Sequence, residues 1–207
     1  MLKPYERNEE LSKDFIQGWY MPEESISDLL SESKKLYSDG YFKFADEPRN
    51  YKGLDLEQFS DTSKNNFLYN INEVILNYQE KYSYLCSLNF KLFNSVNVQY
   101  WEPGKSYSKF HYELESATEH ILRNLVFMTY LNDIEDGGET EFHYQKVKIK
   151  PKKGLTIVWP ANWTHTHRGC MTNEHKHAMT GWFEIVPTKP NIYYDIPNIE
   201  NRKLDYE

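Results

Sequence analysis

The chain has 207 residues, a formal net charge of -7 and an aromatic content of 16%. The acidic balance argues against nucleic acid as a partner, because proteins that bind phosphate backbones concentrate lysine and arginine. No apolar run suggests a signal sequence or a membrane anchor, and the cysteines Cys86 and Cys170 lie far apart, so we expect a reduced cytoplasmic protein whose cysteines pack as small apolar residues.

The length suits a single β-rich domain over residues 1–207, with helical additions. No internal repeat and no linker divides the chain. We expect three parts, namely a helical supporting region over residues 1–89, a β-rich catalytic core over 90–186 and a C-terminal tail over 187–207.

Two helices are predicted within the supporting region. The first begins at Pro22, where a proline followed by two glutamates suits a helix start, and it ends at Asp39-Gly40. The second is capped within residues 61–63, and its apolar face contains Phe67, Ile71, Val74, Ile75 and Tyr78. Residues 41–60, between the helices, are interrupted by proline and glycine and are predicted to form a loop.

After residue 89 the pattern changes to short β-rich runs. They cover residues 90–101, 121–131, 140–142, 147–149, 155–159, 164–168 and 177–186. About eight strands separated by short turns favour a jelly roll over an α/β sheet. The fold class expected is therefore mainly β with N-terminal helices (α+β), in which the helices support a jelly-roll core.

All seven histidines lie between His111 and His177. His111 and Glu113 are two residues apart, so on a strand both side chains can face one ion. A distant histidine would complete a set of two histidines and one carboxylate, which leaves coordination positions open and is diagnostic of non-haem Fe(II) oxygenases. Strand alternation does not choose between His165 and His167 for this third ligand, because both would face the same way.

At these residues the chain resembles the 2-oxoglutarate and Fe(II)-dependent dioxygenases of the prolyl 4-hydroxylase-like branch, and the short stand-alone members encoded by phages look most similar. Residues 100–113 resemble the family's Tyr-x-x-Gly-x-x-Tyr-x-x-His-x-Asp stretch, with one residue inserted before His111 and with Glu113 in place of aspartate. The family's distal histidine lies one residue before an x-Gly pair and nine or ten residues before a basic residue. The resemblance therefore implies His167, which is followed by Arg168-Gly169 and then by Lys176.

The resemblance also implies a role for each site residue. Fe(II) would be held by His111, Glu113 and His167. Lys176 would pair with the distal carboxylate of 2-oxoglutarate, Tyr130 would donate its hydroxyl to the same carboxylate, and Thr140, in the family's Gly-Gly-x-Thr-x-Phe stretch, is a candidate pocket residue. The tryptophan six residues after the lysine also follows the family's spacing. By their size, we expect four tryptophans to pack the barrel, namely Trp101, Trp159, Trp163 and Trp182.

The fold and activity implied are a double-stranded β-helix (jelly roll, cupin-like) and a dioxygenase of class EC 1.14.11.-. It would use O2, with ascorbate as reductant, to hydroxylate an unactivated C–H bond, and would release succinate and CO2. The substrate would be a peptide, a protein or a free amino acid, and peptidyl proline is the leading expectation. A phage protein would act in the host cytoplasm, and the sequence leaves the oligomeric state open. The alternative is a non-catalytic jelly-roll module that binds a metal or a small ligand. The presence of both Tyr130 and Lys176 favours the enzyme.

Overall fold

The computed structural model describes residues 5–11, 13–114 and 119–186, so the expected tail over 187–207 lies outside the described residues. The described part contains two long helices, α1 (Glu23–Ser38) and α2 (Asp61–Lys81). Its strands are β1 (Gln17–Tyr20), β2 (Lys43–Ala45), β3 (Tyr51–Asp55), β4 (Phe90–Leu92), β5 (Asn97–Trp101), β6 (Arg123–Tyr130), β7 (Thr140–Phe142), β8 (Val147–Ile149), β9 (Leu155–Pro160), β10 (His167–Gly169) and β11 (Lys176–Ile185).

Both predicted helices are confirmed. Pro22 is the N-cap of α1, and the helix ends at Asp39, followed by Gly40 with a positive φ of 82°. Helix α2 is capped one residue earlier than the predicted range, because the Ser60 side chain accepts from the backbone N–H of Ser63. Every residue of its predicted apolar face is buried.

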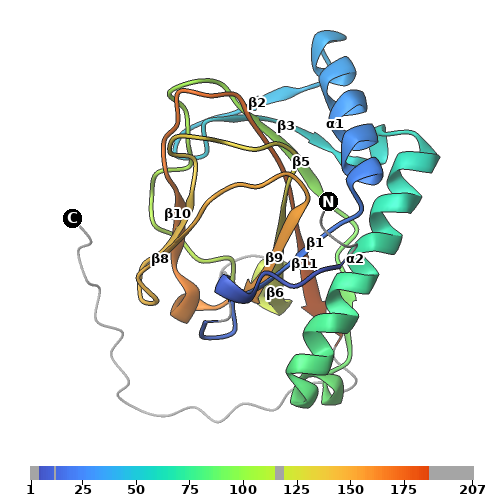
Figure 1. The fold of residues 1–207 in the computed structure, drawn as a ribbon, viewed down its shortest axis with the longest axis vertical. Helices are drawn as coiled ribbons and strands as arrows, with labels where there is room; N and C mark the ends of the chain where they lie inside the picture. The colour runs from blue at the N-terminus through green and yellow to red at the C-terminus, as the bar shows by residue number, and fades with distance from the viewer. Residues whose placement is uncertain (1–4, 12, 115–118, 187–207) are drawn as a thin grey trace.

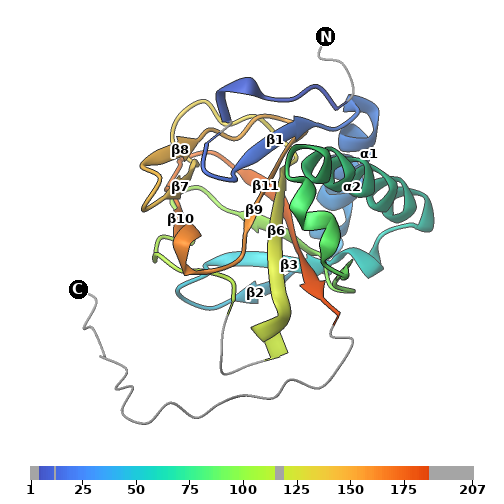
Figure 2. The same ribbon diagram turned by 90° about the horizontal axis from the view of Figure 1, so that it is seen from below.

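The strands form two antiparallel sheets that enclose a barrel. The large sheet has the order β1-β9-β6-β11-β5-β3-β2, and β4 pairs with the far end of β11. The small sheet has the order β10-β7-β8. The two long helices lie side by side against the outer face of the large sheet, whereas the small sheet lies on the opposite side of the barrel (Figures 1 and 2). This arrangement is the predicted double-stranded β-helix supported by helices.

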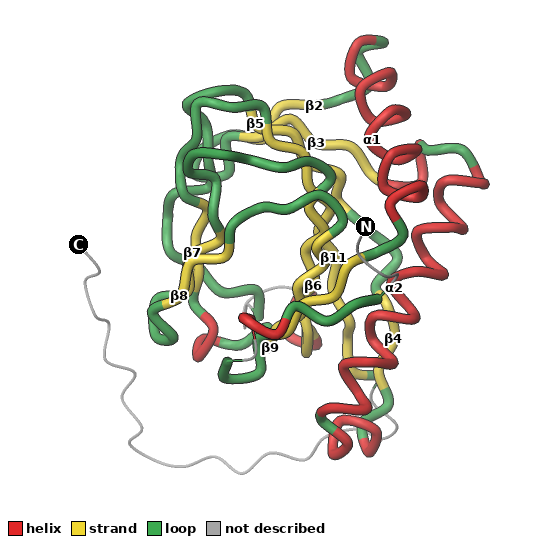
Figure 3. The backbone as a smooth tube through the Cα atoms, in the orientation of Figure 1, coloured by secondary structure: helices red, strands yellow, loops and turns green. Residues whose placement is uncertain are grey.

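The predicted loop over residues 41–60 is wrong, because β2 and β3 form a hairpin there and β3 pairs with β5. Upstream, β1 pairs with β9. The region expected to be helical support therefore adds three strands to the large sheet, two of which, β2 and β3, are labelled in Figure 3. The predicted number of about eight strands is confirmed for residues 90–186, where the structure has β4 to β11. The three added strands have three to five residues each, and their pairing with β9, β5 and each other specifies them more than their own side chains do.

A second correction concerns residues 164–168, which were predicted to form a strand. The segment Trp163–His165 is a 3-10 turn, and β10 starts only at His167. The turn is stabilised by Asn162, whose side-chain oxygen accepts from the backbone N–H of Thr164 at 3.1 Å.

The prediction that both cysteines pack as small apolar residues is wrong for Cys86, which is exposed. Cys170 is half-buried.

Apolar residues are buried on both faces of the large sheet. On β6, Leu125 and Phe127 belong to the cluster packed with the helices, whereas Val126 and Tyr130 belong to the cluster that fills the barrel. Because both faces are covered, six of the eight residues of β6 are buried, and residues 125–128 form a continuous apolar run. Among the described residues, neither helix combines the length and apolarity needed to cross a bilayer.

The docking of α2 gives a stability prediction. Phe67 is fully buried and its ring centroid lies 5.9 Å from that of Phe127 on β6. Phe67→Ala should lower the free energy of unfolding by about 3–5 kcal/mol, because a large cavity would remain between helix and sheet. Tyr69→Ala, on the same helix but 65% exposed, is the control and should cost about 0.5 kcal/mol or less. Denaturant titration measures both, and equal losses would contradict this packing.

Candidate metal centre and active site

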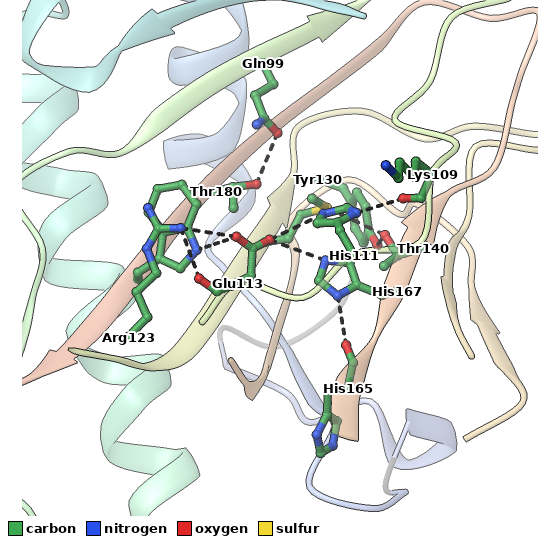
Figure 4. A network of polar contacts seen from close by, with 12 residues as sticks. Gln99, Lys109, His111, Glu113, Arg123, Tyr130, Thr140, His165, His167 and Thr180 are labelled. Atoms are coloured by element: carbon green, nitrogen blue, oxygen red, sulfur yellow. Dashed lines mark hydrogen bonds and ion pairs between the residues drawn. The ribbon is translucent and has the colours of Figure 1, made fainter. Parts of the chain in front are cut away.

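Backbone hydrogen bonds bring the candidate ligands together. His111 and His167 form an antiparallel bridge in which each N–H donates to the carbonyl of the other residue, at 2.9 and 2.8 Å. Two residues later, the N–H of Glu113 donates to the carbonyl of Ala161 at 3.0 Å. The side chains of His111 and Glu113 then point toward His167 (Figure 4).

The three side chains present their ligand atoms to one point. All three atoms lie within 4.8 Å of one another. Oε1 of Glu113 is 3.6 Å from Nε2 of His111 and 3.4 Å from Nε2 of His167. Two imidazole nitrogens and one carboxylate oxygen are the donor set that binds non-haem Fe(II) and leaves positions open for other ligands.

The hydrogen bonds of the two imidazoles define which nitrogen is available to a metal. Nδ1 of His111 lies 2.9 Å from the carbonyl oxygen of Lys109, and Nδ1 of His167 lies 2.9 Å from that of His165. A carbonyl oxygen only accepts, so each Nδ1 carries the proton and each Nε2 keeps its lone pair. Burial also lowers the pKa of His167, which favours the neutral ring that a metal requires.

The carboxylate of Glu113 is held in place by donors. Burial raises its pKa, but hydrogen bonds and charge from His111 and His167 in their protonated form outweigh burial and hold the pKa of Glu113 well below its usual range, and a divalent metal ion would take the place of those protons. Its second oxygen, Oε2, accepts from Nε1 of Trp182 at 3.1 Å and from Arg123 at 3.4 Å. Two neutral imidazoles and an anionic carboxylate with one free oxygen therefore fit a divalent metal ion.

The structure separates the two histidines that strand alternation left equivalent. Because Trp163–His165 is a 3-10 turn, His165 points away from Glu113, and its Nε2 lies 2.7 Å from the carbonyl oxygen of Asp14. Its backbone carbonyl instead accepts from His167, as noted above. His165 thus contacts the His167 ring through its backbone, but its own side chain lies away from His111 and Glu113. His167 lies beside both of these residues.

The three side chains line one cavity with a volume of about 430 Å³. Lys176 and Thr140 line the same cavity. Tyr130 does not line it but lies directly behind, where its hydroxyl group is 2.7 Å from that of Thr140. The structure therefore brings all six predicted site residues into one region, with Tyr130 reaching the cavity through Thr140.

The comparisons with known proteins agree with this geometry. Residues 96–184 match the sequence profile of the 2OG-Fe(II) oxygenase superfamily. The matched residues run from β5 into β11 and contain all six candidate site residues. A stretch of 115 residues, 42% of the chain, is also 28% identical to the probable prolyl 4-hydroxylase 9 of Arabidopsis thaliana, and it spans only 40% of that protein.

Solved structures share the fold of most of this chain. The viral collagen prolyl hydroxylase of Paramecium Bursaria Chlorella virus-1, in its 2OG complex, superposes with a TM-score of 0.64 at 20% identity, over 85% of this chain and 99% of that one. A prolyl-4-hydroxylase of Pseudomonas putida superposes with a TM-score of 0.67 at 18% identity, over 84% and 95%. At such identities the likeness establishes the fold alone.

Within the cavity, Lys176 is a buried cation without a carboxylate partner among the described residues. Its Nζ donates to the carbonyl of Gly138 at 2.7 Å and lies 5.1 and 5.5 Å from the ring centroids of Trp101 and Tyr130. Gly138 and Gly137 both have positive φ, near 70°, which lets the turn before β7 present that carbonyl inward. Burial lowers the pKa of Lys176 to about 8.

Sequence reasoning missed two contacts of this site. Arg123, at the start of β6, was assigned no role, although it is buried against Glu113 and Trp182. The Tyr107 ring stacks on His111 with centroids 3.8 Å apart. An arginine at the beginning of an otherwise apolar strand was the only sequence indication of the first contact.

The tryptophan prediction holds in part. Trp159 is fully buried and Trp101 nearly so, but Trp163 is 62% exposed, because it lies on the 3-10 turn instead of a strand. Trp182 does more than pack, since its indole N–H binds Glu113. Among the histidines given no role, His177 is buried, and burial lowers its pKa to about 4.

Lys176 gives the second prediction, because its lowered pKa is a cost to the folded state of roughly 3 kcal/mol at neutral pH. Lys176→Met should raise the free energy of unfolding at pH 7 by about 1–3 kcal/mol, after the lost hydrogen bond to Gly138 is subtracted. The cost is fully present below pH 8 and fades as the pH rises toward the ordinary lysine value of 10.5.

The stability difference between wild type and Lys176→Met should therefore shrink between pH 8 and pH 10.5, as measured by denaturant titration at several pH values. Lys105→Met is the matched control, because Lys105 lines the same cavity but is exposed. A Lys176→Met variant that is less stable than wild type at pH 7 would contradict the predicted cost of the buried charge.

Proposed function

We propose that this protein is a 2-oxoglutarate-dependent dioxygenase that hydroxylates an unactivated C–H bond. Peptidyl proline is the substrate class that we favour. One observation carries the proposal. Nε2 of His111, Nε2 of His167 and Oε1 of Glu113 converge at a cavity that also contains the buried cation of Lys176. A metal ligand set and an anion partner in one cavity are the two requirements for binding Fe(II) and 2-oxoglutarate together.

Each of these groups has a defined task in the proposed reaction. Bound Fe(II) and 2-oxoglutarate supply the oxidising chemistry, in which one oxygen atom of O2 enters the substrate C–H bond and the other enters succinate as CO2 is released. His111, Glu113 and His167 would hold the metal, each through one atom. Lys176 binds the distal carboxylate, because a dianion entering a buried site needs a charged partner.

The surroundings of Lys176 exclude water from that carboxylate. The faces of Trp101 and Tyr130 lie against the ammonium group, and Thr140 presents the hydroxyl that Tyr130 positions. An arriving anion raises the pKa of Lys176 again, so the lysine stays protonated when the co-substrate is bound. The co-substrate would thus supply the carboxylate partner that Lys176 lacks among the described residues.

Peptidyl proline is supported by the relatives and by the cavity lining. The relatives named above include prolyl hydroxylases, and a prolyl hydroxylase of Trichoplax adhaerens with the same fold was solved with a hypoxia-inducible factor peptide, at a TM-score of 0.67 and 14% identity. In this chain aromatic rings contribute to the cavity wall, among them Tyr51, Tyr112 and Trp182. Such rings suit the apolar pyrrolidine ring of proline.

The co-substrate site is tested by Lys176→Ala. This variant should weaken 2-oxoglutarate binding by about 30-fold or more, since losing a buried charged partner costs about 2–5 kcal/mol. Its affinity for Mn(II), a redox-stable stand-in for Fe(II), should stay the same. Calorimetric titration measures both, with Lys105→Ala as the exposed-lysine control. An unchanged 2-oxoglutarate dissociation constant would remove Lys176 from the site.

The reaction is tested with the iron-loaded protein, 2-oxoglutarate and ascorbate on a peptide library, followed by mass spectrometry. We expect products heavier by one oxygen atom on proline-containing peptides, together with succinate. Glu113→Gln should abolish both products, because the site loses its anionic ligand, whereas Glu73→Gln on the outer helix α2 should change neither. A wild-type protein that binds 2-oxoglutarate but oxidises no peptide and forms no succinate would support the binding module instead.

A further inference from the structure

The carboxylate of Glu113 has two oxygens in different surroundings. Oε1 faces the two histidines, whereas Oε2 faces Trp182 on β11 and Arg123 at the start of β6 (Figure 4). The indole N–H and the guanidinium group can only donate hydrogen bonds. Both contacts therefore occupy lone pairs of Oε2 that would otherwise be available to a metal ion.

Trp182 and Arg123 are themselves held together. The guanidinium carbon of Arg123 lies 3.8 Å from the ring centroid of Trp182, and both side chains are buried. The same arginine lies 3.4 Å from the backbone carbonyl oxygen of Glu113 as well as from Oε2. Glu113 is thus fixed at its backbone and at the end of its side chain by one pair of stacked residues.

We propose that Trp182 and Arg123 are positioning residues that hold Glu113 as a ligand through one oxygen only. This inference rests on the proposed function, because it concerns how the metal is bound. A six-coordinate metal with three protein ligands has three positions left, which 2-oxoglutarate and O2 fill when the co-substrate binds through two atoms. A glutamate that bound through both oxygens would take one of these positions.

The constraint matters for glutamate because its side chain has one more rotatable bond than aspartate. A longer carboxylate can turn toward the metal in more ways, and each additional conformation lowers the population with Oε1 correctly placed. The contacts to Oε2 select one of these conformations. They explain how this chain keeps an open metal site although Glu113 stands where the resembled family has aspartate.

The first test uses Trp182→Phe, which keeps an aromatic ring near Arg123 and removes the indole N–H together with part of the ring volume. Its Mn(II) dissociation constant should rise by about 10-fold or more, the usual effect of losing a hydrogen bond to a metal ligand. The absorption spectrum of the Co(II) form should also change, because the coordination of Glu113 changes. Arg123→Met should shift both readouts in the same direction. Trp163→Phe, at an exposed tryptophan, is the matched control and should leave both unchanged.

The second test asks whether Trp182 acts through Oε2, by repeating the substitution in Glu113→Asp. The shorter carboxylate cannot contact the metal and the indole at once, so Trp182→Phe should change the Mn(II) dissociation constant less than about 3-fold in this background. Thermal unfolding checks that every variant is folded. If Trp182→Phe does not fold, the same comparison is made with Arg123→Met in the wild-type and Glu113→Asp backgrounds. Equal effects in both backgrounds would overturn the proposal.

The two proposals fail in different ways. A wild-type protein that binds neither Mn(II) nor Co(II) would remove the proposed function itself. A wild-type protein that binds Mn(II) tightly, with unchanged affinity and Co(II) spectrum in folded Trp182→Phe and Arg123→Met, would remove only the positioning role.

Discussion

The paired backbone hydrogen bonds between His111 and His167 are the constraint on which the site depends. They join the segment that follows β5 to the edge of the small sheet, at β10. This pairing sets two imidazoles side by side and leaves Glu113, two residues further, facing both of them. Main-chain hydrogen bonds therefore fix the relative positions of the candidate ligands. Their Nδ1 contacts to carbonyl oxygens then orient the rings.

Strand β11 supplies the second half of the site through simple alternation. Lys176 and Trp182 are six residues apart on this strand, so both face the barrel interior, while Met179 and Phe183 pack toward the helices. The helices cover the outer face and allow β11 to be buried on both sides. Burial gives Lys176 its lowered pKa and its value as an anion partner at the same time. The burial of Lys176 therefore accounts both for the stability that the folded protein loses at this residue and for the affinity that we propose for 2-oxoglutarate.

Local sequence patterns predicted the long elements, in which apolar residues recur along a whole buried face. The apolar face of α2 and the apolar run of β6 were both recognisable, because each is long and buried along a whole face. The strands β1, β2 and β3 were not, since each is short and is defined by its partner strand. The turn Trp163–His165 was mistaken for a strand because the capping contact of Asn162 overrides the alternating pattern of the residues that follow.

The sequence by itself determined the candidate ligands and their chemistry. The spacing of His111 and Glu113 predicted one shared ion, and the resemblance to a dioxygenase family added His167 and Lys176 to the site. Only the tertiary structure decided that His165 turns away from Glu113, that the Tyr130 hydroxyl lies behind Thr140, and that Arg123 and Trp182 contact the second oxygen of Glu113. The physical reason is that spacing along a strand specifies which face a side chain occupies, whereas its hydrogen-bond partners come from strands distant in the sequence.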